Sequence, residues 1–175
     1  MKTKGLYAFE VRYYFINMLK AIYYCHNVVK VVHKDIKPDN IMVGTAREAV
    51  LIDFGVSAMY DHNDDAKDKE NEALQLKAGT YLFFAPELFN CENQYTFGAA
   101  TDMWALGITF FYLLTGQFPF EDAKSIFHLK ELVTTRDINF KLITDEPARH
   151  CIERMLDKDP KTRATIDYLL KTDWV

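Results

Sequence analysis

Apolar residues recur every three or four positions over residues 8–27, a spacing that predicts an amphipathic helix with a wide buried face. Residues 101–114 are apolar almost throughout, which predicts a helix surrounded by protein, and Gly116 is expected to end it. Weaker periodic stretches predict further helices at about residues 123–134, 146–156 and 166–171. The chain is therefore expected to be mainly helical.

Three short apolar runs predict strands at residues 28–32, 41–43 and 50–52. The last two are separated by a polar interval and are expected to form a hairpin. If Val43 lies opposite Val50, then Asn40 lies opposite Asp53, and opposed side chains on one face are about 4.5–5.5 Å apart. Hard cations accept both carboxylate and amide oxygens. This register therefore predicts a shared Mg²⁺ site.

A polar loop precedes the hairpin. Within it, Asp35 and Lys37 are two residues apart, which places their side chains on the same side of an extended backbone. A carboxylate beside an ammonium suits a reaction that takes up a proton and stabilises an anion. The alternatives are that Asp35 only forms a turn before Pro38, and that His33 is a hydrogen-bonded core residue.

Three motifs follow one another along the chain: His33-x-Asp35-x-Lys37-x-x-Asn40, Asp53-Phe54-Gly55 and Ala85-Pro86-Glu87. Together they resemble the catalytic loop, the magnesium-binding loop and the end of the activation segment of eukaryotic protein kinases. The resemblance covers nearly the whole chain but only the larger, C-terminal lobe of a kinase. It implies a mainly α fold with a small β-hairpin region, the α+β C-lobe without the N-terminal β-lobe.

The resemblance implies one partial kinase domain, residues 1–175, with these parts: a catalytic loop (33–40), the Asp-Phe-Gly triplet (53–55), an activation segment (53–87) and a helical subdomain (99–175). Neither the Gly-rich phosphate loop nor the strand lysine and helix glutamate of the smaller lobe occurs ahead of Asp35. We therefore expect a missing N-lobe or upstream segment to be a partner of this chain, which is expected to be inactive alone.

The resemblance also implies roles for the polar residues. Asp35 and Lys37 are the expected catalytic residues: Asp35 accepts the proton of a substrate hydroxyl, and Lys37 contacts the γ-phosphate of ATP. A lysine two positions after the aspartate is typical of serine/threonine kinases. Asn40 and Asp53 are expected to bind Mg²⁺, with Met42 beneath the adenine. The expected ATP-binding residues are Lys37, Asp39, Asn40, Met42, Ile52 and Asp53.

Other residues are expected to support the site: His33 packed beneath Phe54, Asp102 holding the catalytic-loop backbone, Glu87 paired with Arg163, and Thr80 reaching Asp35 and Lys37. Residues 81–84 are expected to form an apolar platform for a peptide; the alternative is that their aromatic rings only fill a buried loop.

The presumed activation segment departs from the family pattern. Residues 61–79 contain no Ser, Thr or Tyr, and Lys34 replaces the arginine that would bind an activating phosphate. We therefore expect a kinase that does not use activation-loop phosphorylation. Lys34 is expected either to pair with an acidic loop residue such as Glu70 or Glu72, or to be solvated.

Composition and charge limit the kinds of ligand and cellular location that we expect for this protein. The net charge of −4 and the pI near 5.7 argue against nucleic-acid binding. The cysteines at 25, 91 and 151 are expected to be reduced thiols, and their spacing from histidine does not fit a zinc site. The apolar run at residues 103–114 is too short to span a membrane. A cytoplasmic protein is expected, with a nuclear location possible.

The sequence thus predicts a serine/threonine protein kinase that transfers the γ-phosphate of ATP to protein hydroxyls in signalling. Within kinases it is most similar to the calcium/calmodulin-dependent protein kinases or their kinase kinases. Two alternatives remain: a truncated pseudokinase that acts as a protein-binding module, and a small-molecule phosphotransferase, which the peptide platform disfavours.

Overall fold

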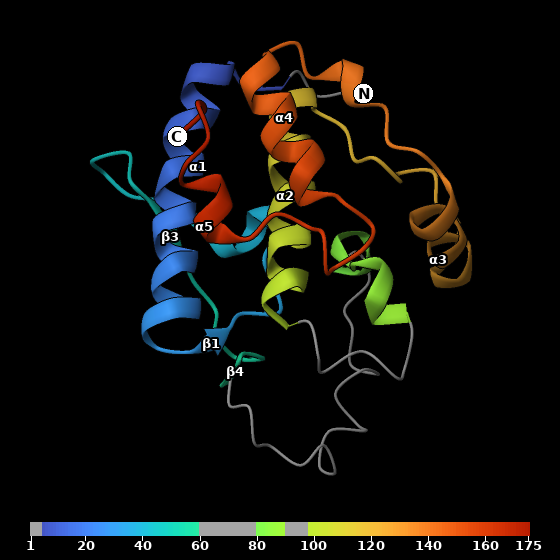
Figure 1. Cartoon of the computed structure of the whole chain (residues 1–175), viewed down its shortest axis with the longest axis horizontal. Helices are drawn as coiled ribbons and strands as arrows, with labels where there is room; N and C mark the ends of the chain where they lie inside the picture. The colour runs from blue at the N-terminus through green and yellow to red at the C-terminus, as the bar shows by residue number, and fades with distance from the viewer. Residues whose placement is uncertain (1–4, 60–79, 90–97) are drawn as a thin grey trace.

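The computed structural model describes residues 5–59, 80–89 and 98–175 (Figure 1). Two long helices form its centre, α1 (Ala8–Tyr23) and α2 (Gly98–Thr115). They pack against each other, with Phe15 and Phe110 in edge-to-face contact at 5.0 Å between ring centroids. α2 is buried continuously from Thr101 to Phe111, as its apolar sequence predicts. The core of the protein therefore lies around α2.

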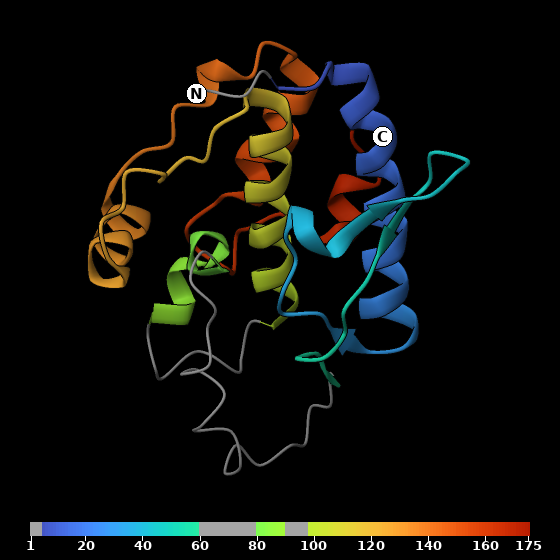
Figure 2. The same cartoon turned by 180° about the vertical axis from the view of Figure 1, so that it is seen from behind.

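The remaining helices surround this pair. α4 (Glu146–Met155) packs on α2, and α5 (Ile166–Leu169) packs on α1. α3 (Ile126–Thr135) lies at the edge of the molecule beside the 3-10 turn η5 (Pro86–Phe89) (Figures 1 and 2). Side-chain caps begin α3, α4 and α5, because Ser125, Asp145 and Thr165 each accept a backbone N–H bond from three residues ahead. Shorter 3-10 turns are η2 (Pro38–Asn40), η4 (Thr80–Phe83) and η6 (Phe140–Leu142).

The first helix confirms the predicted amphipathic pattern. Its buried residues are Val11, Phe15, Met18, Leu19 and Ile22. At its end the helix widens into a π-helical turn, η1 (Tyr24–Val28). The strand predicted at residues 28–32 is correspondingly shorter, since only β1 (Val31–Val32) is extended and Lys30 has a positive φ of 56°.

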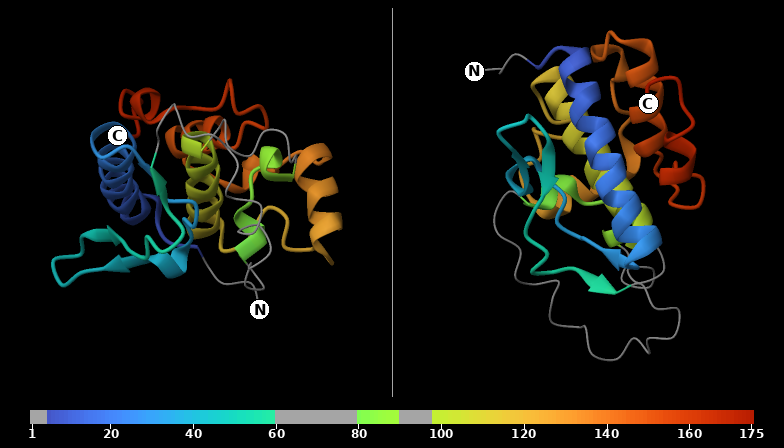
Figure 3. Two further views of the ribbon diagram at one scale, coloured as in Figure 1. Left: turned by 90° about the horizontal axis from the view of Figure 1, so that it is seen from below. Right: turned by 90° about the vertical axis from the view of Figure 1, so that its left-hand side faces the viewer.

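Two antiparallel strand pairs lie in the described part of the chain. β1 pairs with β4 (Ala58–Met59), and β2 (Ile41–Val43) pairs with β3 (Ala49–Leu51) in the predicted hairpin. The hairpin lies beside α1, and its turn projects outward from the molecule (Figure 3). The fold class predicted from the sequence, mainly helical with a small β-hairpin region, is confirmed.

The predicted register of the hairpin is wrong by one residue. Val43 pairs with Ala49, and Met42 pairs with Val50. β3 packs against α1 and buries Ala49 and Leu51, whereas Val50 is 46% exposed. Since successive strand residues face opposite sides, burial of these two side chains fixes the pairing.

Among the described residues, no helix combines the length and apolar character needed to cross a membrane.

Candidate active site

The polar loop between β1 and η2 brings Asp35 and Lys37 together. The Lys37 ammonium lies 2.7 Å from Asp35 Oδ2, and both side chains are largely buried, at 15% and 17% exposure. The sequence prediction that these two side chains share one side of the backbone is confirmed. A cation is thus held directly beside a carboxylate.

Asn40 holds the same aspartate from the other end of the loop. Its amide nitrogen donates to the Asp35 backbone carbonyl at 2.7 Å and to Asp35 Oδ2 at 2.9 Å. The second carboxylate oxygen, Asp35 Oδ1, is buried and has no hydrogen-bond partner among the described residues. A buried carboxylate oxygen without a donor is costly, so it is a natural acceptor for a hydroxyl brought in by a substrate.

Asp53 does not lie directly opposite Asn40, contrary to the prediction. Ile52 occupies that place, because its N–H donates to the Asn40 carbonyl at 2.9 Å. Asp53 then leaves the strand with a positive φ of 64°, and its Oδ1 accepts a 3.2 Å bond from the Gly55 N–H. Left-handed backbone is uncommon for a residue other than glycine and often marks a functional position.

The donor types at these two positions still fit a hard cation. Both hydrogen bonds of the Asn40 side chain are made by its nitrogen, which leaves the amide oxygen as the ligand atom, and the Asp53 side chain is exposed. The described residues contain no group of three or more His, Cys, Asp or Glu that could hold a metal ion. A cation at Asn40 and Asp53 would therefore complete its shell with phosphate oxygens and water.

His33 connects the catalytic loop to the end of the hairpin. The Asp35 N–H donates to His33 Nδ1 at 3.2 Å, so the ring proton is on Nε2, which donates to the Ile52 carbonyl at 3.0 Å. The ring also contacts Phe54 edge-on at 4.7 Å. The predicted packing of His33 against Phe54 is confirmed, and the imidazole acts here as a structural link.

Asp102 anchors the beginning of the loop, as predicted. Its carboxylate accepts the His33 N–H on Oδ2 and the Lys34 N–H on Oδ1, both at 2.8 Å. It also receives a bond that the sequence analysis did not anticipate, from His26 Nε2 at 2.8 Å. Asp102 is 1% exposed, so these donors replace the water that an ionised carboxylate would otherwise bind.

The predicted pair of Glu87 and Arg163 is confirmed and buried. The guanidinium donates to both carboxylate oxygens, at 2.5 and 2.8 Å, and to the Ala100 carbonyl at 2.8 Å. It also lies over the Trp104 ring, 5.1 Å from its centroid. This pair joins η5 to α2 and to the loop before α5.

The apolar residues of the hairpin form an exposed surface next to Asn40. Met42 and Val50 are directly opposed and are 58% and 46% exposed. Ile52 is half-buried and, two positions from Val50, is expected on the same face. Asp39 is exposed in η2. Val50 was not among the predicted site residues; its position on this face follows from the corrected register.

The protein kinase domain family matches residues 2–175 of this sequence. The chain belongs to the protein kinase family. Two relatives are CBL-interacting protein kinase 32 of Oryza sativa subsp. japonica and calcium/calmodulin-dependent protein kinase kinase cmkC of Emericella nidulans. They are 34% identical to it over 165 and 164 residues, or 94% of this chain in both cases. These matches confirm the predicted kinase resemblance, and the second confirms its similarity to the kinase kinases.

A solved structure shares the fold. The crystal structure of the Rad53 kinase domain and SCD2 superposes with a TM-score of 0.76 at 23% identity, covering 97% of this chain and 58% of that one. The kinase chain described here spans about a third of the length of its curated relatives, 36% and 30% for the two named above.

Several kinase predictions fall outside the described residues. Among them are the side chain of Thr80, the acidic partners proposed for Lys34, and residues 61–79, the stretch without Ser, Thr or Tyr. Lys34 itself has a positive φ of 68°.

In the loop predicted as a peptide platform, Phe83 is buried and contacts Phe118 edge-on at 5.5 Å, whereas residues 81, 82 and 84 are half-buried. Both the platform and the filler interpretations remain compatible with these rings.

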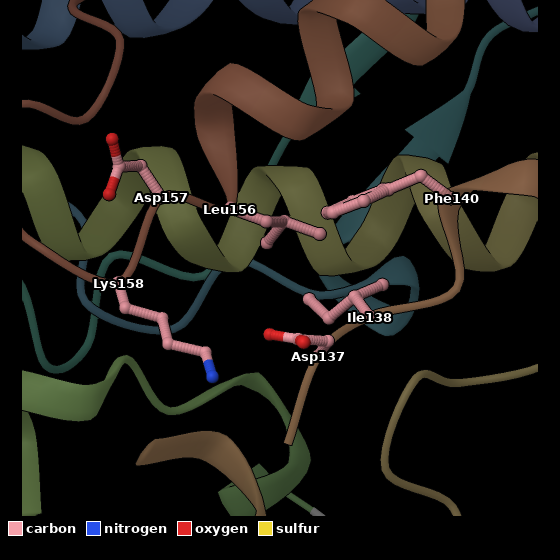
Figure 4. Close-up of a pocket in the computed structure, with 6 residues that line it drawn as sticks. All are labelled: Asp137, Ile138, Phe140, Leu156, Asp157 and Lys158. Atoms are coloured by element: carbon pink, nitrogen blue, oxygen red, sulfur yellow. The ribbon is translucent and has the colours of Figure 1, made fainter. Parts of the chain in front are cut away.

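A pocket in the described part of the chain lies apart from the catalytic-loop residues. Its volume is about 460 Å³, and its lining residues come from the segment after α3 and the end of α4 (Figure 4). Lys158 at its edge donates to the Arg136 carbonyl at 2.7 Å and the Thr134 carbonyl at 3.3 Å. This ammonium thus caps the end of α3.

Proposed function

We propose that this chain provides the catalytic residues of a serine/threonine protein kinase, which transfers the γ-phosphate of ATP to a protein hydroxyl. The observation that carries the proposal is the buried, unpartnered Oδ1 of Asp35 beside the Lys37 ammonium. Serine/threonine-type relatives and the lysine two positions after Asp35 support this substrate class.

The geometry supports a direct in-line transfer. The substrate hydroxyl donates to Asp35 Oδ1, and its oxygen attacks the γ-phosphorus while its proton passes to the carboxylate. The bond from the γ-phosphorus to the bridging oxygen breaks, and ADP leaves with that oxygen. Lys37 supplies a fixed positive charge beside the transferring group. Mg²⁺ held by Asn40 and Asp53 would neutralise phosphate charge.

The exposed hairpin face suits an adenine ring and a covering lobe. Met42, Val50 and Ile52 offer an apolar surface that ends at the polar loop. The segment that follows β3 adds further exposed apolar side chains, since Phe54, Val56 and Met59 are 44%, 50% and 72% exposed. Apolar groups gathered in this way usually mark a binding surface. We infer that a smaller lobe with the phosphate loop and the strand lysine closes over this face.

The test is phosphate transfer by the chain expressed with whatever segment precedes it in its gene. The protein is incubated with γ-labelled ATP, Mg²⁺ and a mixture of protein substrates and small metabolites, and label is followed to phosphoamino acids. The proposal expects label on serine or threonine. Label on a metabolite would favour the small-molecule phosphotransferase. Tight binding of a protein without any transfer would favour the pseudokinase, and either result would overturn the proposal.

A further inference from the structure

The pocket beside α3, lined by the six residues of Figure 4, has no role in the phosphotransferase mechanism. Its walls come from the segment after α3 and from the residues that follow α4. Its volume of about 460 Å³ lies within the range of about 300–1,000 Å³ that is usual for ligand pockets. The pocket is therefore large enough to take a long side chain of a partner molecule.

The floor of the pocket is apolar. Leu156 is 4% exposed, and Ile138 and Phe140 are half-buried. Figure 4 shows these three side chains pointing toward one another. Phe140 also contacts Phe111 edge-on, at 6.4 Å between ring centroids, which holds its ring in place. The floor thus offers a surface for the methylene groups of a ligand.

Two of the three charged residues at the rim are used by the protein itself. Asp157 accepts the Asp159 N–H at 3.1 Å and the Thr162 hydroxyl at 2.9 Å, and its carboxylate points away from the pocket in Figure 4. Lys158 donates to two backbone carbonyls at the end of α3, at 2.7 and 3.3 Å. These bonds fix the rim, so the pocket is preformed.

Asp137 is the charged residue that the rim leaves available. Its side chain is exposed, and it has no hydrogen-bond or ion-pair partner in the described part of the chain. The neighbouring Arg136 does not neutralise it, because that guanidinium donates to both oxygens of Asp122, at 2.7 and 2.8 Å. A carboxylate beside an apolar floor favours a cation carried on an apolar stem. The net charge of −4 favours a basic partner as well.

Arginine suits this combination better than lysine. A guanidinium forms two parallel hydrogen bonds to a carboxylate and stacks on an aromatic ring, and Phe140 supplies such a ring. Lys158 has three N–H groups and uses two, so the third can donate to the backbone carbonyl of the segment that carries the arginine. The carbonyl end of α3 offsets part of the Lys158 charge, which would otherwise disfavour a second cation.

We propose that the pocket beside α3 is a docking site for an arginine side chain of a protein partner, with Asp137 as the residue that binds the guanidinium. Arginine is among the residues that contribute most to binding at protein interfaces. The pocket lies apart from the catalytic-loop residues, so docking does not depend on phosphate transfer. The inference therefore stands whether or not the proposed function holds.

The test is a titration of the full chain with capped pentapeptides, followed by nitrogen-15 NMR. The peptides carry arginine, citrulline or lysine at the centre, with glycine elsewhere. Citrulline keeps the length and planar end of arginine without its charge. The arginine peptide is expected to shift the amides of Asp137, Ile138 and Lys158 saturably. It should bind about tenfold more tightly than the citrulline peptide and about threefold more tightly than the lysine peptide.

Two variants test the role of the carboxylate. Asp137→Asn keeps the size of the side chain and removes its charge, so binding of the arginine peptide should weaken about tenfold and binding of the citrulline peptide should change by less than about twofold. Asp167→Asn is the matched control, because it removes the same charge from an exposed position in α5, which packs on α1. In this control, binding of the arginine peptide should change by less than about twofold.

Four results would overturn the proposal. The first is the absence of shifts at the lining amides up to about 10 mM arginine peptide. The second is equal binding of the arginine peptide and either of the other two peptides. The third is an equal loss of binding in Asp137→Asn and Asp167→Asn. The fourth is a set of shifts at the same amides that depends on protein concentration without any peptide, which would show that a second copy of the chain occupies the pocket.

Discussion

Asn40 and Asp35 are joined by two hydrogen bonds from a single amide nitrogen, one to the Asp35 carbonyl and one to Oδ2. Lys37 is the second donor to Asp35 Oδ2, at 2.7 Å. The carboxylate is therefore asymmetric: Oδ2 is fully engaged by the protein, and Oδ1 is left for a ligand. Under the proposed function this arrangement would give Asn40 two separate tasks, since its nitrogen orients the Asp35 carboxylate while its oxygen is available to a cation.

Replacing Asn40 and Asp53 should therefore have different consequences. Asn40→Ala removes both the orienting bonds and one cation ligand, so we expect a loss of about 10²-fold or more in transfer rate that excess Mg²⁺ does not restore. Asp53→Asn weakens only the binding of the cation. Raising the Mg²⁺ concentration or adding Mn²⁺ should therefore recover a large part of the activity of this variant. The measurement is the initial rate of phosphate transfer against metal concentration. Equal recovery of the two variants would contradict the double role of Asn40.

Breaking the ion pair of Glu87 and Arg163 should destabilise the whole domain. Arg163→Ala leaves a carboxylate buried at 6% exposure without its partner, and such one-sided losses typically cost about 3–5 kcal/mol. Urea unfolding followed by circular dichroism measures the change in free energy of unfolding. Arg149→Ala is the control, because the ion pairs that Arg149 makes in the described part of the chain, with Glu146 and Glu153, lie at the surface, and about 1 kcal/mol or less is expected. Similar costs for both variants would contradict the structural role of the buried pair.

The two described cysteines should be unreactive in the folded protein. Burial raises the pKa of the Cys25 thiol, and the nearby Asp102 charge raises this pKa further. Burial also raises the pKa of Cys151, which donates to the Thr172 hydroxyl at 3.2 Å. Because the thiolate is the nucleophile, iodoacetamide at neutral pH should leave both residues unmodified and should modify both in urea. Peptide mass spectrometry resolves each site, and rapid alkylation of either cysteine in the native protein would show that its environment is more open.

Most helices were predictable because local periodicity determines them. The buried stripe of α1 and the continuous burial of α2 follow directly from their apolar spacing. The predicted ends differ by a few residues where a capping side chain decides the boundary, as Ser125 does for α3. These signals lie within the segment itself, so a single sequence contains them.

The hairpin register was not predictable in the same way. Residues 50–52 are all apolar, and no alternation tells which of them faces inward; contact with α1 buries Leu51 and leaves Val50 exposed. The link from His26 to Asp102 spans 76 residues, and no local pattern indicates it. Pairing of β1 with β4 is likewise a long-range contact. The motifs nevertheless brought Asp35, Lys37 and Asn40 together in the prediction, and the structure places these side chains in contact, because their spacing is fixed within one loop.

The central claim is that Asp35 is the base of a phosphoryl transfer. The most direct measurement is the rate of transfer from ATP to protein hydroxyls by the chain with its upstream segment, compared with Asp35→Asn. The substitution keeps the size of the side chain and removes its ability to accept a proton as a carboxylate. We predict a loss of about 10²–10⁴-fold with unchanged unfolding behaviour and unchanged binding of ATP. Retention of the original rate by Asp35→Asn would contradict the account.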